Sequence, residues 1–293
     1  MDKHFVSIII VNYNGISDTL ALIESLYLYN TYKSEIIVVD NGSKVDETYQ
    51  INKIYPDVIT IRSDKNLGFA GGNNLGIKHS KGDAIFFINN DTIVCMDGIN
   101  LLIENLFSDP QIGGISPKIK FHFPPNNIQF AGYTELSQYT LRNKLIGFNC
   151  PDNEKYNALS ETFYLHGAAM LIKRSVIDAI GGIPEYYFLY YEEIDWSLRM
   201  RNSGYKLIYN PNYTIFHKES QSTGQDSPLR TYYLVRNRLL FASKNRIGKN
   251  RWISILFQTS LSIPKDIMKS IIKGRFDISL SIIKGVKDFI LLK

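Results

Sequence analysis

The sequence predicts an α/β fold, with a doubly wound and mostly parallel sheet followed by amphipathic helices. Three observations indicate this class. Short runs of β-branched and apolar residues are hydrophobic on both faces, which is typical of strands buried inside a parallel sheet. Stretches with apolar residues at helical spacing separate those runs, so strands and helices alternate. Each run also ends in Asn, Asp, Gly or Ser, the residues that end strands and form turns.

The predicted elements follow a regular order along the chain. The run "VSIIIVNYNG" predicts a first strand, "SDTLALIESLYLYN" a helix and "SEIIVVDNGS" a second strand. "DVITIRS" predicts a third strand, "GGNNLGIKHS" a helix that begins near Gly72, and "DAIFFINND" a fourth strand. With 293 residues, 44% of them hydrophobic, the chain is long enough for one large domain and an appendage.

Polar residues follow three of the four predicted strands. In open α/β sheets ligands bind beyond the carboxyl ends of the strands, so these side chains are expected to form one polar edge. Each cluster taken singly is ordinary turn chemistry, but the three together favour a binding site. The clusters are Asn12, Tyr13 and Asn14; Asp40, Asn41, Gly42 and Ser43; and Asn89, Asn90 and Asp91.

The segment "NLGFAGGNN" matches neither the phosphate-binding loop with Gly-Lys-Ser/Thr nor the dinucleotide GxGxxG fingerprint. Its glycines, Gly68, Gly71 and Gly72, would still let the backbone approach a ligand closely. A helix that begins near Gly72 would direct free N–H groups at an anion such as a diphosphate. A glycine-assisted helix start without a ligand is the alternative.

The stretch "YYEEIDWSLRMRNSG" predicts a helix that starts near Glu192 and ends at Gly204. Glu192 and Glu193 then lie in its first turn, where acids complement the helix dipole, and Asp195 can pair with Arg199. This structural explanation does not exclude a chemical role for one of the two glutamates.

Two cysteines, Cys95 and Cys150, lie far apart, which argues against a disulfide framework and fits a reducing compartment. The N-terminal apolar run, of about six residues, is shorter than the ~7 to 15 of an export signal. No apolar stretch reaches the ~20 residues of a spanning helix. We therefore expect a cytoplasmic protein.

The C-terminal segment is strongly basic. Residues 229–293 contain 14 Lys/Arg against three Asp/Glu, a net charge of +11, whereas residues 1–228 contain 19 against 25. We expect a catalytic domain at 1–228 and a basic segment of two or three amphipathic helices, broken near Pro264 and Gly274, at 229–293. Such a segment suits a peripheral position on the inner face of an anionic membrane. A solvated basic face, packing on the domain and self-association are the alternatives, and no recognised nucleic-acid-binding motif is present.

Seven motifs, taken in this order, resemble the family 2 inverting glycosyltransferases of the GT-A fold, and they are most similar to its rhamnosyltransferase-like branch. The resemblance covers residues 6 to 241. The motifs are "VSIIIVNYNG", "IIVVDNGS", "NLGFAGGNN", "FFINNDT", "HGAAMLIKR", "YYEEIDWSLR" and the histidine of "TIFHKES".

The resemblance implies that Asp91 and His217 hold a divalent cation, Mg²⁺ or Mn²⁺. Asp91 matches the final acid of the family's Asp-x-Asp motif, although Asn89 and Asn90 stand at the other two positions. His217 stands where family members bring a second metal ligand. One carboxylate with carbonyl-type neighbours suits an ion that keeps waters and takes phosphate oxygens from the substrate. Metal affinity without the donor should therefore be weak.

The resemblance also implies roles in catalysis and donor binding. Glu193 is the expected general base and Glu192 the second choice; the family commonly has Asp at the position of Glu193, so this side chain is one methylene longer. Asp40 would read the nucleobase or ribose, and Gly167 would leave room for the donor sugar or the acceptor. The expected donor-binding residues are Asn12, Tyr13, Asn14, Asp40, Asn41, Asn66, Gly68, Gly72, Asn90 and Gly167.

The expected function is metal-dependent, inverting transfer of a sugar, with rhamnose as one candidate, in surface polysaccharide biosynthesis. The donor would be a dTDP-, UDP- or GDP-linked sugar and the acceptor a glycan or lipid-linked glycan. Inversion is favoured because no separate enzyme nucleophile can be nominated. A nucleotidyltransferase and a catalytically silent sugar-nucleotide-binding subunit are the alternatives, and donor, linkage and oligomeric state stay open.

Overall fold

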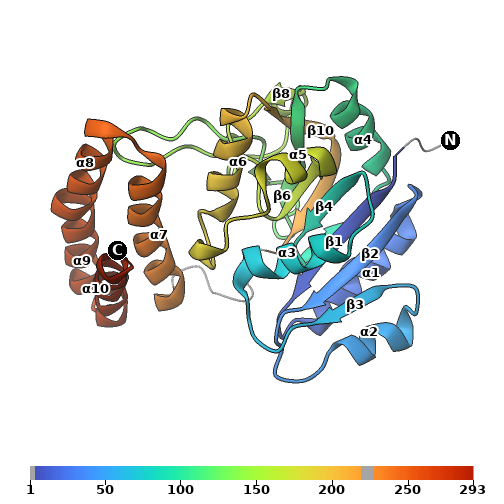
Figure 1. Ribbon diagram of the computed structural model, residues 1–293, viewed down its shortest axis with the longest axis horizontal. Coiled ribbons are helices and arrows are strands. Elements are labelled where there is room, and N and C mark those ends of the chain that lie inside the picture. The colour runs from blue at the N-terminus through green and yellow to red at the C-terminus, as the bar shows by residue number, and fades with distance from the viewer. Residues whose placement is uncertain (1–3, 219–226, 293) are drawn as a thin grey trace.

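A ten-stranded sheet runs through the computed structural model, which describes residues 4–218 and 227–292 (Figure 1). The strand order is β3-β2-β1-β4-β9-β6-β10-β5, and β7 and β8 pair with β6 and β10 at the side of this path. The strands are β1 (Val6–Asn12), β2 (Ser34–Asp40), β3 (Ile59–Arg62), β4 (Ala84–Ile88), β5 (Thr92–Val94), β6 (Ile112–Phe121), β7 (Ile128–Phe130), β8 (Ser160–Glu161), β9 (Ala169–Lys173) and β10 (Lys206–His217).

The first half of the sheet, β3-β2-β1-β4, is parallel throughout, as the sequence predicts. In the second half β9 runs antiparallel between β4 and β6, whereas β6 and β10 are parallel to each other. The predicted strands all lie in the parallel half, because only there do buried apolar runs alternate with helices. The α/β fold class is confirmed, with a mixed sheet beyond β4.

Helices cover both faces of the sheet, which explains why its central strands are apolar on both sides. Ile8 and Ile10 of β1 pack in one core cluster with α1 (Ile16–Tyr29), α2 (Thr48–Ile54) and α4 (Ile99–Ser108). Ile9, pointing the other way, packs in a second cluster with α3 (Gly68–His79), α5 (Arg174–Ile180) and α6 (Glu192–Asn202). This alternation is the period of two that a strand imposes on its side chains.

Two predicted helix boundaries have different outcomes. Helix α6 begins at Glu192 and is followed by Gly204 with φ +88°, as expected for a glycine at a helix end. Helix α3 begins at Gly68, four residues earlier than the predicted start near Gly72. Gly71 and Gly72 therefore lie inside the helix. Close packing against Leu67 and Val11 explains why both positions are glycine, since a Cβ atom at either would clash.

The basic C-terminal segment forms α7 (Pro228–Asn245), α8 (Gly248–Phe257), α9 (Ile263–Ile272) and α10 (Phe276–Leu291). The chain breaks at Gly274 as predicted, but at Pro264 it continues through a π-helical turn, Gln258–Ser262, which accommodates a proline in the first turn of α9. Figure 1 shows these helices as a bundle beside α6. None of the helices in the described part of the chain has the length and apolar character needed to cross a bilayer.

A third core cluster joins this bundle to the rest of the molecule. Leu239 and Phe241 of α7 pack with Tyr187 and Tyr191, which lie in the turn just before α6. Helix α7 is therefore in contact with the segment that carries the two predicted catalytic glutamates. The domain division at residue 228 stays a prediction.

Candidate active site

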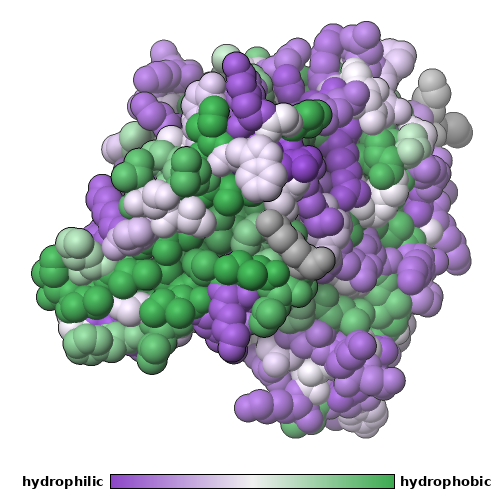
Figure 2. Space-filling model, turned by 60° about the vertical axis from the view of Figure 1, so that its left-hand side comes forward, coloured by the Kyte–Doolittle hydropathy of each residue, from purple (hydrophilic) through white to green (hydrophobic). Residues whose placement is uncertain are grey.

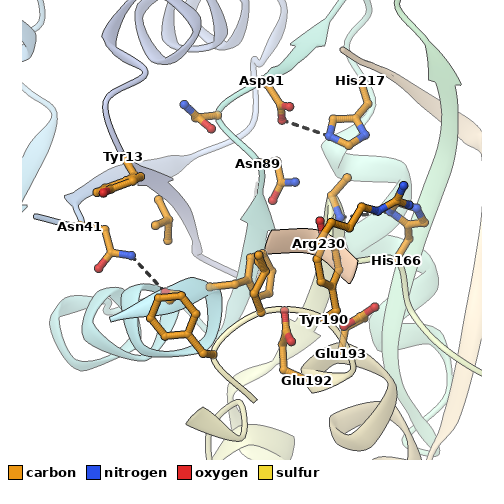
Figure 3. Close-up of a pocket in the computed structure, with 18 of the residues that line it drawn as sticks. Tyr13, Asn41, Asn89, Asp91, His166, Tyr190, Glu192, Glu193, His217 and Arg230 are labelled. Atoms are coloured by element: carbon orange, nitrogen blue, oxygen red, sulfur yellow. Dashed lines mark hydrogen bonds and ion pairs between the residues drawn. The ribbon is translucent and has the colours of Figure 1, made fainter. Parts of the chain in front are cut away.

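A cavity of about 510 Å³ lies at the carboxyl ends of β1, β2 and β4, with the start of α6 on its other side (Figure 3). This is the edge at which the sequence places a ligand site. Ten predicted site residues line the cavity: Tyr13, Asn41, Asn66, Gly68, Asn90, Asp91, Gly167, Glu192, Glu193 and His217. Four others, Asn12, Asn14, Asp40 and Gly72, are outside the lining.

Asp91 and His217 meet although 126 positions separate them in the sequence. Asp91 lies between β4 and β5, and His217 is the last residue of β10. Strands β5 and β10 pair antiparallel, with His217 opposite Thr92, so the histidine comes beside the residue that precedes β5. His217 Nε2 is 3.0 Å from Asp91 Oδ1, and both side chains are buried (Figure 3).

The hydrogen bond on the other side of the ring determines what Nε2 presents to Asp91. His217 Nδ1 is 2.8 Å from Gln129 Oε1, and since this oxygen only accepts, Nδ1 carries a proton. In the neutral imidazole the lone pair of Nε2 therefore faces a carboxylate oxygen. Two acceptors this close call for a proton or a metal cation between or beside them.

The residues present fit a small divalent cation. Two neighbouring ligands of an octahedral ion with bonds of about 2.1 Å lie about 3.0 Å apart, which matches the separation of Nε2 and Oδ1. Within residues 4–218 and 227–292 no cluster of three or more His, Cys, Asp or Glu side chains could hold a metal. Among the described residues, Asp91 and His217 are therefore the pair whose geometry fits such an ion.

Asp40 and Asn12 are buried and held by other protein groups. Asp40 accepts hydrogen bonds from the Ser43 backbone N–H at 3.0 Å and from Arg62 Nη1 at 3.0 Å. Asn12 donates to Glu47 Oε2 at 2.6 Å and accepts from Thr19 Oγ1 at 2.7 Å. In this arrangement both side chains support the loops behind the cavity wall.

Asn41 fastens the Gly/Asn segment to the end of β2. Its amide nitrogen donates to the carbonyl of Gly68 at 3.0 Å, and its oxygen accepts from the Leu67 N–H at 3.0 Å (Figure 3). The predicted free N–H groups at the helix start are partly occupied: Gly68 N–H donates to Asn66 Oδ1, and Phe69 N–H donates to the carbonyl of Phe188. A Cβ atom at position 68 would lie only 2.2 Å from this Phe188 carbonyl oxygen, so the contact requires glycine.

The turn 187–191, just before α6, is strained. Phe188, Tyr190 and Tyr191 have φ values of +69°, +66° and +78°, a region that residues other than glycine rarely adopt. Each such residue costs about 1–3 kcal/mol, and such conformations persist only where the surrounding structure fixes them. The two glutamates that follow this turn point into the cavity (Figure 3).

The two glutamates differ in their surroundings. Burial, followed by repulsion from Glu193, holds the pKa of Glu192 well above its usual range, and Glu192 Oε2 has no hydrogen-bond partner among the described residues. Burial raises the pKa of Glu193 to about 7. The surroundings of Glu192 therefore favour its neutral form, while Glu193 can accept a proton.

Asp195, one turn further along α6, has a structural role. Its Oδ1 accepts from Arg199 Nε at 2.7 Å, which confirms the predicted pairing. Its Oδ2 accepts from the hydroxyls of Tyr186 and Tyr187 and from the Asn245 amide. This buried carboxylate ties α6 to the preceding turn and to the end of α7.

Sequence reasoning missed several lining residues, among them Gln129, Tyr133, Tyr190 and Arg230, and left His166 aside. His166 Nδ1 accepts from the Ala168 N–H at 3.1 Å, and burial, with repulsion from His217, lowers the pKa of His166 to about 3. The neutral ring therefore carries its proton on Nε2. Arg230 comes from α7, and no local motif indicates that this helix reaches the cavity; its basic character was the only signal.

The similarity to solved structures shows the class of fold. A mannosyltransferase from Pyrobaculum calidifontis, solved with GDP-Man and Mn²⁺, superposes with a TM-score of 0.61 at 13% identity, over 99% of this chain and 88% of that one. GalNAc-T7, solved with UDP, GalNAc and Mn²⁺, also has a TM-score of 0.61, at 15% identity, over 83% of this chain and 51% of that one. Both have the GT-A fold of glycosyltransferases.

The chain belongs to glycosyltransferase family 2, because the family model "Glycosyl transferase family 2" matches residues 7–181. It is a glycosyltransferase, as the motifs predict, and its similarity to the rhamnosyltransferase-like branch agrees with the names of several relatives.

Curated relatives carry related names. The low-salt glycan biosynthesis hexosyltransferase Agl10 of Haloferax volcanii is 29% identical over 88% of this chain and 81% of its own length. The N-acetylglucosaminyl-diphospho-decaprenol L-rhamnosyltransferase of Mycobacterium tuberculosis is 24% identical over 69% of this chain and 72% of its own. The O-antigen chain rhamnosyltransferase RfbN of Salmonella typhimurium is 25% identical, over 75% and 68%.

Proposed function

We propose that this glycosyltransferase transfers a sugar from a nucleotide diphosphate donor, with inversion and with the help of a divalent cation, to a glycan or lipid-linked glycan of a surface polysaccharide. One observation carries the proposal. Asp91 and His217 line the same cavity as Glu192 and Glu193, which come from the other side of it (Figure 3). A candidate site for the departing diphosphate therefore shares one space with a candidate base for the acceptor.

Asp91 and His217 would hold Mg²⁺ or Mn²⁺. The cation, once bound, supplies positive charge beside the diphosphate as negative charge develops on it. Gln129 keeps the proton on His217 Nδ1 and so leaves Nε2 available as a ligand. With two ligands from the described residues, affinity should be high when the donor's phosphate oxygens are present and low without them.

Glu193 would act as the general base. The acceptor hydroxyl attacks the anomeric carbon and its oxygen forms the new glycosidic bond. The bond from that carbon to the phosphate oxygen breaks, the nucleoside diphosphate leaves, and the hydroxyl proton passes to Glu193. A base with a pKa of about 7 matches a neutral operating pH. Burial favours the neutral form of Glu192, and in that form its carboxyl group can donate a hydrogen bond to a sugar hydroxyl in the same space.

The nucleotide would occupy the part of the cavity lined by Tyr13, Asn41 and Asn66. Tyr13 offers an exposed aromatic ring on which a base can stack. Rhamnose is the first sugar to test, because two of the relatives above are named as rhamnosyltransferases. The mycobacterial relative's name also specifies a lipid-linked diphosphate acceptor, which favours an acceptor of that kind here.

The helices α8–α10 would hold the enzyme on the inner face of the membrane, where a lipid-linked acceptor is found. Large apolar side chains are exposed along them, and Figure 2 shows an extended hydrophobic area on this side of the molecule. Basic residues accompany them, among them Lys265, Lys269 and Lys273. Apolar insertion next to lysines is the usual combination for binding anionic lipid surfaces.

Hydrolysis of a donor panel tests the proposal. The intact chain is incubated with UDP-, GDP- and dTDP-linked sugars, including dTDP-rhamnose, with and without Mn²⁺. We expect slow, metal-dependent release of one nucleoside diphosphate. Hydrolysis that is equally fast with EDTA would contradict the metal role, and absence of both cleavage and binding of every donor would favour a silent subunit.

A further inference from the structure

The turn 187–191 and helix α7 are joined by an unusual set of hydrogen bonds. Asn237 of α7 is completely buried, and its amide nitrogen donates to the carbonyls of Tyr187 at 3.0 Å, Leu189 at 2.6 Å and Tyr190 at 2.9 Å. The two N–H groups of one side chain are thus shared among three carbonyls in a span of four residues. Buried carbonyls of an irregular turn need such donors, because the helix or sheet ladder does not supply them.

The amide is itself held in place. Asn237 Oδ1 accepts from Arg236 Nε at 2.8 Å, which directs the NH₂ group toward the turn. Arg236 Nη2 donates to the Tyr187 carbonyl as well, and Arg238 Nε donates to the Tyr191 hydroxyl at 2.9 Å. Three consecutive residues of α7 therefore bind the same turn.

The left-handed residues explain why the turn needs this support. Phe188, Tyr190 and Tyr191 all have positive φ values, and Tyr191 directly precedes Glu192. If the backbone at Tyr190 or Tyr191 relaxed to negative φ, the first turn of α6 would move and both glutamates would leave their places in the cavity. Packing of the tyrosines in the third core cluster limits this movement but does not bind the carbonyls.

We propose that Asn237 is a positioning residue, which holds the turn 187–191 in its left-handed conformation and so keeps Glu193 at the reacting atoms. This inference rests on the proposed role of Glu193 as the base. It assigns a catalytic consequence to a residue of the C-terminal segment that touches neither metal nor donor. Helix α7 then belongs functionally to the catalytic unit.

The variant Asn237→Asp tests the proposal, since it keeps the shape and replaces the donating NH₂ by an accepting oxygen that faces the three carbonyls. We expect kcat to fall by about 10²-fold while the donor KM changes by less than about threefold, because a misplaced base affects the transition state more than donor binding. Hydrogen exchange of the amides at 188–193 should become faster. The substrate is the panel donor that the intact chain cleaves.

A matched control separates positioning from general destabilisation. Asn210 lies in β10, outside the cavity lining, and is also completely buried. Its side-chain amide donates to the Leu101 carbonyl. Asn210→Asp should lower the melting temperature but leave kcat and the exchange at 188–193 unchanged. If Asn237→Asp does not fold, Arg236→Met, which removes two of the supporting bonds from a half-buried position, should lower kcat in the same way.

The outcomes distinguish this inference from the proposed function. Equal kcat values for Asn237→Asp and Asn210→Asp, with unchanged exchange at 188–193, would overturn the positioning role. Glu193→Gln is measured in parallel: if it retains full kcat, the proposed base is wrong, whereas the exchange rates still decide whether Asn237 holds the turn.

Discussion

Neighbouring residues with the same side chain have different chemistry here. Glu192 and Glu193 share the first turn of α6, and burial raises the pKa of both, that of Glu193 to about 7. Glu192 is buried more completely, and the negative charge of Glu193 opposes its ionisation. Two neighbouring carboxyl groups in different surroundings are a common arrangement for an acid and a base.

The raised pKa of Glu193 gives a pH prediction. A base works only when deprotonated, so below pH 7 kcat/KM, which reports pKa values of the free enzyme, should fall by about tenfold per pH unit and above it should level off. His166 adds no step to this profile between about pH 5 and 9, because its pKa of about 3 keeps it neutral there. The measurement is donor turnover at donor concentrations well below KM across that range. A rate that stays constant between about pH 5 and 7 would contradict the assignment of Glu193.

The same substitution at two cavity glycines should change stability by different amounts. In Gly68→Ala the new Cβ would lie 2.2 Å from the Phe188 carbonyl at a φ of +73°, so we expect a loss of more than about 1 kcal/mol in unfolding free energy. In Gly167→Ala the nearest atoms are Phe69 Cζ at 3.6 Å and Glu193 Cγ at 3.9 Å, so stability should change by less than about 0.5 kcal/mol.

Activity separates the two variants further. The methyl group of Gly167→Ala occupies cavity space beside the base and should lower kcat/KM for the donor without unfolding the chain. Urea unfolding and donor turnover measure both effects. Unchanged turnover in Gly167→Ala would show that neither donor nor acceptor uses the space next to Glu193.

At the scale of elements, the sequence predicts what depends on local pattern. The strands β1 to β4 and the helix α6 follow from apolar runs, helical spacing and terminal glycines, and the structure confirms them. The predicted start of α3 was wrong. The helix begins at Gly68, where close contact with the Phe188 carbonyl leaves no room for a Cβ atom, and Phe188 lies far away in the sequence. Strand β9 is the fifth strand of the sheet by position, but its antiparallel insertion has no local signal.

The C-terminal helices give a prediction at this scale. If α8–α10 bind an anionic bilayer, replacing exposed apolar residues by acids, as in Met268→Glu with Leu280→Glu, should abolish cosedimentation with phosphatidylglycerol vesicles. The control is Tyr49→Glu, which changes an equally exposed apolar residue on α2. If both variants sediment with the vesicles as the intact chain does, the lipid-binding surface lies elsewhere. If the intact chain does not sediment with the vesicles, α8–α10 do not bind this anionic bilayer.

For the whole molecule, the sequence predicted the edge of the sheet at which the cavity lies, together with ten of its lining residues. Strand ends in a parallel sheet meet by topology, which is why Asp91 was found from its position alone. Gln129 and Arg230 come from β7 and α7, elements whose approach to the cavity depends on tertiary packing. Asn237 belongs to the same group: nothing in its surroundings along the chain indicates three carbonyl partners.

The charge distribution agrees with this arrangement of parts. An acidic body carries the cavity and a basic bundle stands beside α6, so an anionic surface would attract one side of the molecule and repel the other (Figure 1). The proposed membrane function and the proposed catalytic function thus use different parts of one chain, with α7 in contact with both.

The central claim is that one cavity combines a metal site at Asp91 and His217 with a base at Glu193. Single-turnover release of nucleoside diphosphate tests it most directly, with the intact chain, Asp91→Ala and Glu193→Ala compared in the presence and absence of Mn²⁺. The account predicts Mn²⁺-dependent release by the intact chain, no response to Mn²⁺ in Asp91→Ala, and slow release with Mn²⁺-dependent donor binding retained in Glu193→Ala. Full, Mn²⁺-stimulated release by Asp91→Ala, or full release by Glu193→Ala, would contradict it.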